Sequence, residues 1–124
     1  MVHKQVIIVL IVLIVFPLNA SPAHLHPEKG YQNKWCAAHN GVTEYQLPDK
    51  TRVDCLTDTH AIEFDFAHKW AESVGQSLYY ASLTGKKAGI VLIVEDIKDM
   101  RFVNRLLQIA CYLDITVWII TPQD

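Results

Sequence analysis

The chain has 124 residues, of which 11 are Lys or Arg and 13 are Asp or Glu, and 51% of its side chains are hydrophobic. This length suits one compact domain and is too short for two of ordinary size. The slight excess of acids argues against broad electrostatic capture of nucleic acid, although it leaves room for a small site with local positive charge.

The first twenty residues have the layout of a secretory signal peptide. Lys4 precedes an unbroken apolar run over 6–16, and small residues lead to Ala20. The run is about half of the roughly 20 apolar residues that span a bilayer, and Pro17 ends it. We expect cleavage after Ala20, with Ala23 as second choice and an uncleaved membrane anchor as the alternative. The cleaved protein would be periplasmic or secreted, without stable membrane association, and would keep 10 basic and 13 acidic residues, a net charge of −3.

Three cysteines in an exported chain indicate one disulfide and one thiol left over. We expect a bridge between Cys36 and Cys55, which would stabilise the fold by about 3 kcal/mol. Cys111 lies in an apolar helical stripe and is predicted to be a buried, inert thiol. The alternative is a loosely spaced zinc site with the ligands His24, His26, Cys36 and His39.

The hydrophobic pattern predicts a single α/β domain over residues 31–124, joined to the leader by a linker over 21–30. The expected elements are a helix over 31–38, strands over 41–47, 51–57 and 61–66, a helix over 68–83, a strand over 88–94, a helix from Asp96 or Asp99 to about 113, and a strand over 115–120. The first three strands would form an antiparallel meander. The strand-helix-strand end would be a parallel crossover, so the predicted sheet is mixed.

The second predicted hairpin has one apolar and one acidic side. A turn at Asp58 and Thr59 gives a register in which Asp54 stands opposite Glu63, and Asp65 stands on the same side. The apolar side would consist of Val53, Cys55, Ile62, Phe64 and Phe66.

Carboxylates that face each other across two strands, with Cβ atoms about 5 Å apart, destabilise a sheet unless a cation joins them. A cluster of carboxylates suits Mg²⁺ or Mn²⁺. Glu44 would join Asp54 if the first hairpin has a three-residue loop over 48–50, whereas a four-residue loop would put Tyr45 there. The alternative is a solvated acidic face on which Arg52, opposite Asp65, neutralises that acid.

A polar stripe on the helix over 68–83 could face the same acids. Its members are Lys69, Glu72, Gln76 and Tyr80. They lie opposite the apolar stripe of Trp70, Val74 and Leu78, so they would turn toward the acids if the helix packs over the meander. The alternative is an ordinary amphipathic edge.

In this order, the residues resemble the PD-(D/E)XK nuclease superfamily, which has the restriction-endonuclease-like fold. Its core is a helix, a three-strand meander, a helix and a strand, with an Asp on the second strand and Glu-x-Lys on the third. Here Asp54 and the run Glu63-Phe64-Asp65 stand at those places, and 76–80 is similar to the Gln-x-x-x-Tyr motif of the recombination and repair branch. The resemblance covers about residues 31–94 and extends to small exported bacterial members.

The resemblance implies that Asp54 and Glu63 bind a divalent metal together with the carbonyl of Phe64. It implies that Gln76 and Tyr80 position the substrate phosphate or the water at the metal.

The sequence departs from the family at Asp65, which stands where the family has Lys. A carboxylate could bind a second metal ion instead, and Lys69 could supply the missing positive charge. The resemblance thus implies an Mg²⁺- or Mn²⁺-dependent endonuclease that cleaves DNA outside the cytoplasm and that pairs, like many relatives, as a homodimer. The alternative is a catalytically inactive binding module of the cell envelope with the same fold.

Overall fold

The computed structural model describes residues 23–124. The predicted signal peptide, 1–20, lies outside the described residues. None of the helices between residues 23 and 124 has the length and apolar character that a membrane-spanning segment needs.

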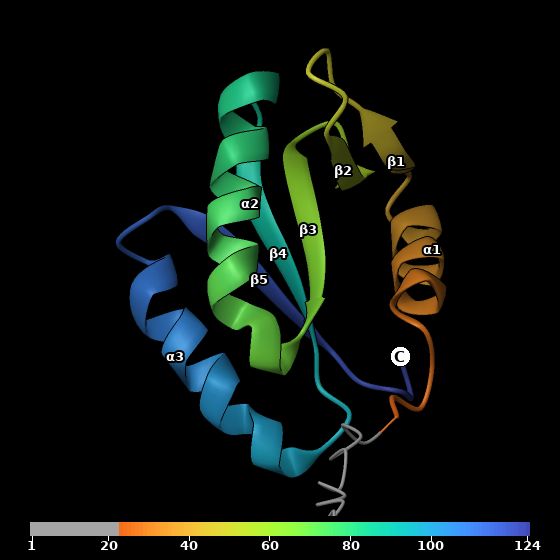
Figure 1. Cartoon of the computed structure of the whole chain (residues 1–124), viewed down its shortest axis with the longest axis vertical. Helices are drawn as coiled ribbons and strands as arrows, with labels where there is room; N and C mark the ends of the chain where they lie inside the picture. The colour runs from red at the N-terminus through yellow and green to blue at the C-terminus, as the bar shows by residue number, and fades with distance from the viewer. Residues whose placement is uncertain (1–22) are drawn as a thin grey trace, which may run out of the picture.

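The helices and strands follow the predicted order along the described chain (Figure 1). Their bounds are α1 Glu28–Ala38, β1 Val42–Gln46, β2 Arg52–Leu56, β3 His60–Phe66, α2 Trp70–Thr84, β4 Lys87–Ile93, α3 Met100–Ala110 and β5 Ile115–Ile120. Short 3-10 helices, Ala67–Lys69 and Ile97–Asp99, precede α2 and α3. The predicted α/β class with a mixed sheet is therefore confirmed.

The sheet has the order β1-β2-β3-β4-β5. β1, β2 and β3 pair antiparallel as a meander, whereas β3, β4 and β5 pair parallel through helical crossovers. Helix α1 lies on one face of this sheet, and α2 and α3 lie on the other (Figure 1).

The core has two main parts, one on each face of the sheet. Phe64, Val91 and Ile93 pack with α1 residues on one face. Ile90 and Leu92 pack on the other face, in a cluster that includes residues of α2 and α3. Alternate residues of β4 thus point to opposite faces, which explains its continuous apolar sequence.

Val53 departs from the predicted pattern. It packs with Leu47, Ala61 and Tyr80 in a third cluster and not with the α1 side. The regular pairing of β2 with β3 ends at the pair Cys55 and Ile62, so the expected alternation does not extend to Val53.

The predicted disulfide joins Cys36 of α1 to Cys55 of β2, with the Cα atoms 5.8 Å apart. Gly41 permits this contact, because a Cβ atom there would lie 2.4 Å from one sulfur and 2.6 Å from the other. Disulfides persist in oxidising compartments, so the bridge is compatible with a location outside the cytoplasm. Because Cys36 is oxidised, it cannot serve as a thiolate ligand, and the zinc alternative is wrong.

The start of α1 and the end of α3 differ from the prediction, and each difference moves a residue into or out of a helix. Helix α1 begins at Glu28, inside the predicted linker, because Pro27 presets an extended entry and an acid in the first turn favours a helix. Helix α3 ends at Ala110, so Cys111 falls in the following turn. The Cys111 thiol is exposed, and the prediction that it is buried is wrong.

Candidate functional site

Three acids from two neighbouring strands lie on the side of the sheet that α2 covers. Asp54 comes from β2, and Glu63 and Asp65 come from β3. The pairs Cys55 with Ile62 and Leu56 with Ala61 have the predicted register, and a hydrogen bond between the two carboxyls brings Asp54 and Glu63 together. Beyond the paired residues, the backbone N–H of Phe64 donates to Oδ2 of Asp54 at 2.8 Å. This bond holds the Asp54 carboxyl against β3.

Glu44, on β1, stands opposite Asp54 of β2. The flanking pairs, Thr43 with Cys55 and Tyr45 with Val53, fix this position. The first hairpin therefore has the three-residue loop of the two alternatives. Glu44 has a φ of 52°, in the left-handed region, which interrupts the regular strand.

Gln32 of α1 ties these two acidic residues together. Its Nε2 donates to Oε1 of Glu44 at 3.1 Å and to the backbone carbonyl of Asp54 at 2.7 Å. The side chain is 1% exposed, so its amide is committed to these partners. The sequence argument missed Gln32, although it lies four residues before the disulfide cysteine and hence on the same, inner face of α1.

Glu28, one turn before Gln32, adds a further carboxyl. Burial, followed by the charge of Asp54, raises the pKa of Glu28, whereas the charge of Lys69 lowers it. The sequence argument missed Glu28 because it placed this residue in a linker.

Glu63 is the most constrained acid of the site. It is 6% exposed, and its Oε2 atom is buried without a hydrogen-bond partner among the described residues. Burial, the charge of Asp54 and a hydrogen bond to that carboxyl raise the pKa of Glu63 to about 10. Burial and the neighbouring acids therefore favour the protonated form of Glu63.

The pKa values of the neighbouring acids, Asp54 and Asp65, are also raised. Burial raises the pKa of Asp54 to about 6 against the opposing hydrogen bonds from Phe64 and Glu63. Burial, followed by the charge of Glu28, raises the pKa of Asp65 to about 7. We call Glu44, Asp54, Glu63 and Asp65, together with Glu28, the acidic site.

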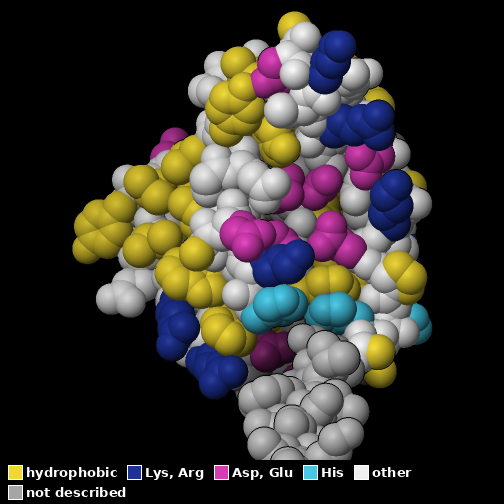
Figure 2. All heavy atoms as spheres, viewed as in Figure 1, with side chains coloured by type: hydrophobic (Ala, Val, Ile, Leu, Met, Phe, Trp, Pro, Cys, Tyr) yellow, Lys and Arg dark blue, Asp and Glu magenta, His cyan; other side chains and the backbone are white. Residues whose placement is uncertain are grey.

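Lys69 brings positive charge to the acidic site. It ends the 3-10 turn before α2, and its charge lowers the pKa values of both Asp65 and Glu28. Figure 2 shows Asp and Glu side chains gathered between α2 and α1, with Lys or Arg side chains beside them. The described residues contain no ion pair between Arg52 and Asp65, so neutralisation by Arg52 is not how this structure balances Asp65.

The other members of the predicted polar stripe on α2 differ in burial, since one is buried and two are exposed. Tyr80 is buried, and burial together with the charges of Glu63 and Asp54 raises the pKa of its hydroxyl. Glu72 is exposed, and its charge contributes to the raised pKa of Asp65. Gln76 is exposed on α2, and the hydrogen bonds of the described residues do not join it to the acidic site.

The acidic site does not form a finished metal cage. Within residues 23–124, no group of three or more His, Cys, Asp or Glu side chains is arranged so as to hold a metal ion. The backbone positions are fixed by the sheet and by Gln32. Rotation of the carboxyl side chains would therefore be needed for several of them to reach one ion.

Comparisons with protein-family models, with curated proteins and with solved structures find no match to this chain.

Proposed function

We propose that this protein is an exported phosphodiesterase that uses Mg²⁺ or Mn²⁺ to cleave DNA outside the cytoplasm. The observation that carries the proposal is the buried Oε2 of Glu63, beside Asp54 and Asp65, which has no hydrogen-bond partner in the part of the chain that the structure describes. Buried carboxyls with raised pKa values lower the stability of a fold at neutral pH unless they keep a proton or gain a cation. A bound divalent cation would replace the proton on Glu63 and satisfy its free oxygen.

The residues fit such a cation by their chemistry. Asp54 and Glu63 would hold it, with Asp65 and Glu44 as further oxygen ligands, and carboxylate oxygens are the ligands that Mg²⁺ and Mn²⁺ prefer. When bound, the cation would lower the pKa of a water molecule and neutralise charge on a phosphodiester. Hydrolysis would add this water across one P–O bond and yield a phosphate monoester and a hydroxyl.

The chain's own groups have separate tasks in this proposal. The Phe64 N–H keeps the Asp54 carboxyl oriented, and Gln32 fixes the backbone on which Asp54 stands. Lys69 supplies the positive charge that the resemblance assigns to the position of Asp65, and it would face the phosphate. Tyr80 would place its hydroxyl near the same oxygens.

The order of the elements also supports the proposal. The succession of α1, β1, β2, β3, α2 and β4, with β4 parallel to β3, agrees with the core that the nuclease resemblance implies. We therefore propose a restriction-endonuclease-like core extended by α3 and β5.

A catalytically inactive binding module is the second candidate. The buried carboxyl of Asp65 favours it, because an acid at this position repels a phosphate instead of attracting it. In that case the cation would be retained without cleavage.

The test uses the chain from residue 21, titrated calorimetrically with Mn²⁺ and Mg²⁺ and assayed for nicking of a supercoiled plasmid. In the double variant Asp54→Asn with Glu63→Gln, we expect binding and nicking to be lost together. Asp114→Asn is the matched control, because Asp114 has a φ of 53°, which Asn also adopts, and lies just before β5, outside the acidic site.

Each outcome separates the candidates. Cation binding without nicking would favour the binding module, and no binding by the wild type would contradict both. Gain of nicking in Asp65→Lys would show that the site lacks only the positive charge at this position.

A further inference from the structure

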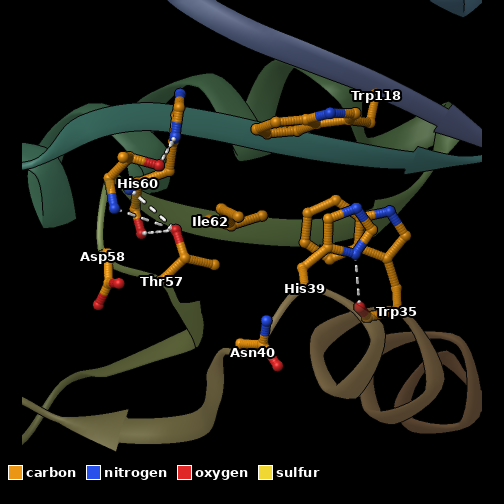
Figure 3. A pocket seen from close by; sticks show the side chains of 9 residues that line it. Trp35, His39, Asn40, Thr57, Asp58, His60, Ile62 and Trp118 are labelled. Atoms are coloured by element: carbon orange, nitrogen blue, oxygen red, sulfur yellow. Dashed lines mark hydrogen bonds between the residues drawn. The ribbon is translucent and has the colours of Figure 1, made fainter.

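A cavity of about 250 Å³ opens on the side of the sheet that carries α1. It lies between the end of α1, the turn from β2 to β3, and β5 (Figure 3). The lining residues that matter here are Trp35, His39, Asn40, His60, Ile62 and Trp118. The cavity is separate from the acidic site, because none of the residues of that site lines it.

Trp118 is held in a fixed position in this cavity. A Cβ atom on Gly89 would lie 2.9 Å from the ring, so the missing side chain of Gly89 is what lets Trp118 lie close over the sheet. The ring makes edge contacts with Trp35 and with His60, each with 5.2 Å between centroids. Figure 3 shows Trp118 above Ile62 along one side of the cavity.

The two histidines are also fixed, and one of them keeps a free nitrogen. His60 is bonded at both ring nitrogens, to Thr59 at 2.7 Å and to Thr116 at 3.0 Å. His39 stacks on Trp35 at 3.5 Å and donates from Nδ1 to the Trp35 carbonyl at 2.8 Å. In the neutral ring, Nε2 of His39 is then left as an acceptor.

Two further polar groups stand at the rim. Asn40 has a φ of 55°, and its side-chain amide has no hydrogen-bond partner among residues 23–124. Asp58 lines the cavity as well, and none of the described side chains pairs with its carboxyl. No Lys or Arg is among the described residues that line the cavity.

We propose that this cavity binds a neutral pyranose sugar. A fixed aromatic ring packs well on the C–H face of a sugar, and the groups of His39, Asn40 and Asp58 can bond its hydroxyls. Among the described residues, the lining includes the acid Asp58 and no Lys or Arg, which disfavours a phosphorylated ligand, although Lys86 lies just outside and donates to the backbone carbonyl of Asp58 at 2.7 Å. The volume is below the ~300–1,000 Å³ of sites for drug-sized ligands, which suits one ring and not a long chain.

The test follows the indole N–H resonances of the ¹⁵N-labelled chain from residue 21 during titration with D-glucose and with N-acetyl-D-glucosamine. We expect one of these sugars to shift the Trp118 resonance with a Kd of about 1 mM, an ordinary affinity for one small ring. Glucose 6-phosphate and adenosine should bind at least tenfold more weakly, because the first brings negative charge and the second needs a different hydrogen-bond pattern.

Two variants test the residues themselves. Trp118→Ala, followed at the indole N–H resonance of Trp35, which also lines the cavity, should weaken sugar binding at least tenfold. Asn40→Gly should weaken it about threefold without backbone strain, since glycine adopts the φ of this position freely. Asn40→Gly keeps the test decisive if Trp118→Ala fails to fold. Tyr112→Ala is the control, because Tyr112 is an 85% exposed aromatic residue in the turn after α3.

Three results would overturn the proposal. The first is that neither sugar shifts the Trp118 resonance at about 50 mM, fifty times the expected Kd. The second is that adenosine or glucose 6-phosphate binds more tightly than the sugars. The third is that the folded variants bind the sugar as the wild type does.

Discussion

The two sides of β3 differ sharply, although the strand is buried on both. Ile62, Phe64 and Phe66 pack into the apolar cluster under α1. Glu63 and Asp65 point to the other side, and burial raises the pKa values of both. The first side contributes stability, whereas the second lowers stability at neutral pH. This cost of keeping buried acids is what the proposed cation would offset.

The largest expected effect comes from breaking the apolar side. Phe64 is fully buried, and Phe64→Ala should lower the free energy of unfolding by about 3–5 kcal/mol through lost burial and a cavity. Urea unfolding followed by tryptophan fluorescence measures this. A loss below about 1 kcal/mol would show that the cluster under α1 is not the main source of stability.

Removing the disulfide on the same side should cause the second largest loss of stability. Replacing Cys36 and Cys55 together by Ala should cost about 3 kcal/mol, because the reduced unfolded chain is less constrained. Thermal unfolding at fixed pH measures the change. Cys111→Ala is the control and should change stability by less than about 0.5 kcal/mol, since its thiol is exposed.

A substitution on the acidic side should have the opposite sign. Glu63→Gln should raise the free energy of unfolding of the cation-free protein at pH 8 by about 2–3 kcal/mol, because it removes a buried ionisable group. The same variant should lose Mn²⁺ affinity. The control Asp114→Asn, outside the acidic site and just before β5, should change neither quantity. Destabilisation by Glu63→Gln with intact Mn²⁺ binding would make Glu63 a structural residue only.

The smallest effect is a pH dependence of stability. The pKa of Asp65 is raised from 3.8 to about 7 in the folded protein, so the folded state binds more protons than the unfolded chain between these values. The stabilising contribution of Asp65 to the free energy of unfolding is fully present below pH 3.8 and is lost as the pH rises through about 7. Asp65→Asn should therefore reduce the fall in stability between pH 5 and pH 8 by about 1–2 kcal/mol. Urea midpoints across this range test it, and an unchanged slope would contradict it.

Much of the fold could be predicted because it follows from local patterns. The alternation in β2 and β3, with a short turn between them, was enough to predict that Asp54 lies beside Glu63. The apolar run of β4 predicted a strand covered on both faces. The cysteines of α1 and β2 could be paired because an exported chain favours one bridge.

The site was harder to predict because its remaining parts come from tertiary contacts. Glu28 belongs to the site because α1 begins at Glu28 and not at residue 31, and Gln32 belongs to it because α1 packs on β2. The α2 stripe divided because the helix turns Ser73, Ser77 and Tyr80 toward the sheet and leaves Gln76 outside. Helical spacing alone does not say which of two polar stripes is the inner one.

The bridge between Cys36 and Cys55 has a consequence for when the acidic site is completed. It ties the helix that carries Glu28 and Gln32 to the strand that carries Asp54. A newly made chain in a reducing cytoplasm lacks this bond. If the bond closes only in an oxidising compartment, as the proposed export implies, the redox state of that compartment becomes a condition for assembly of the acidic site.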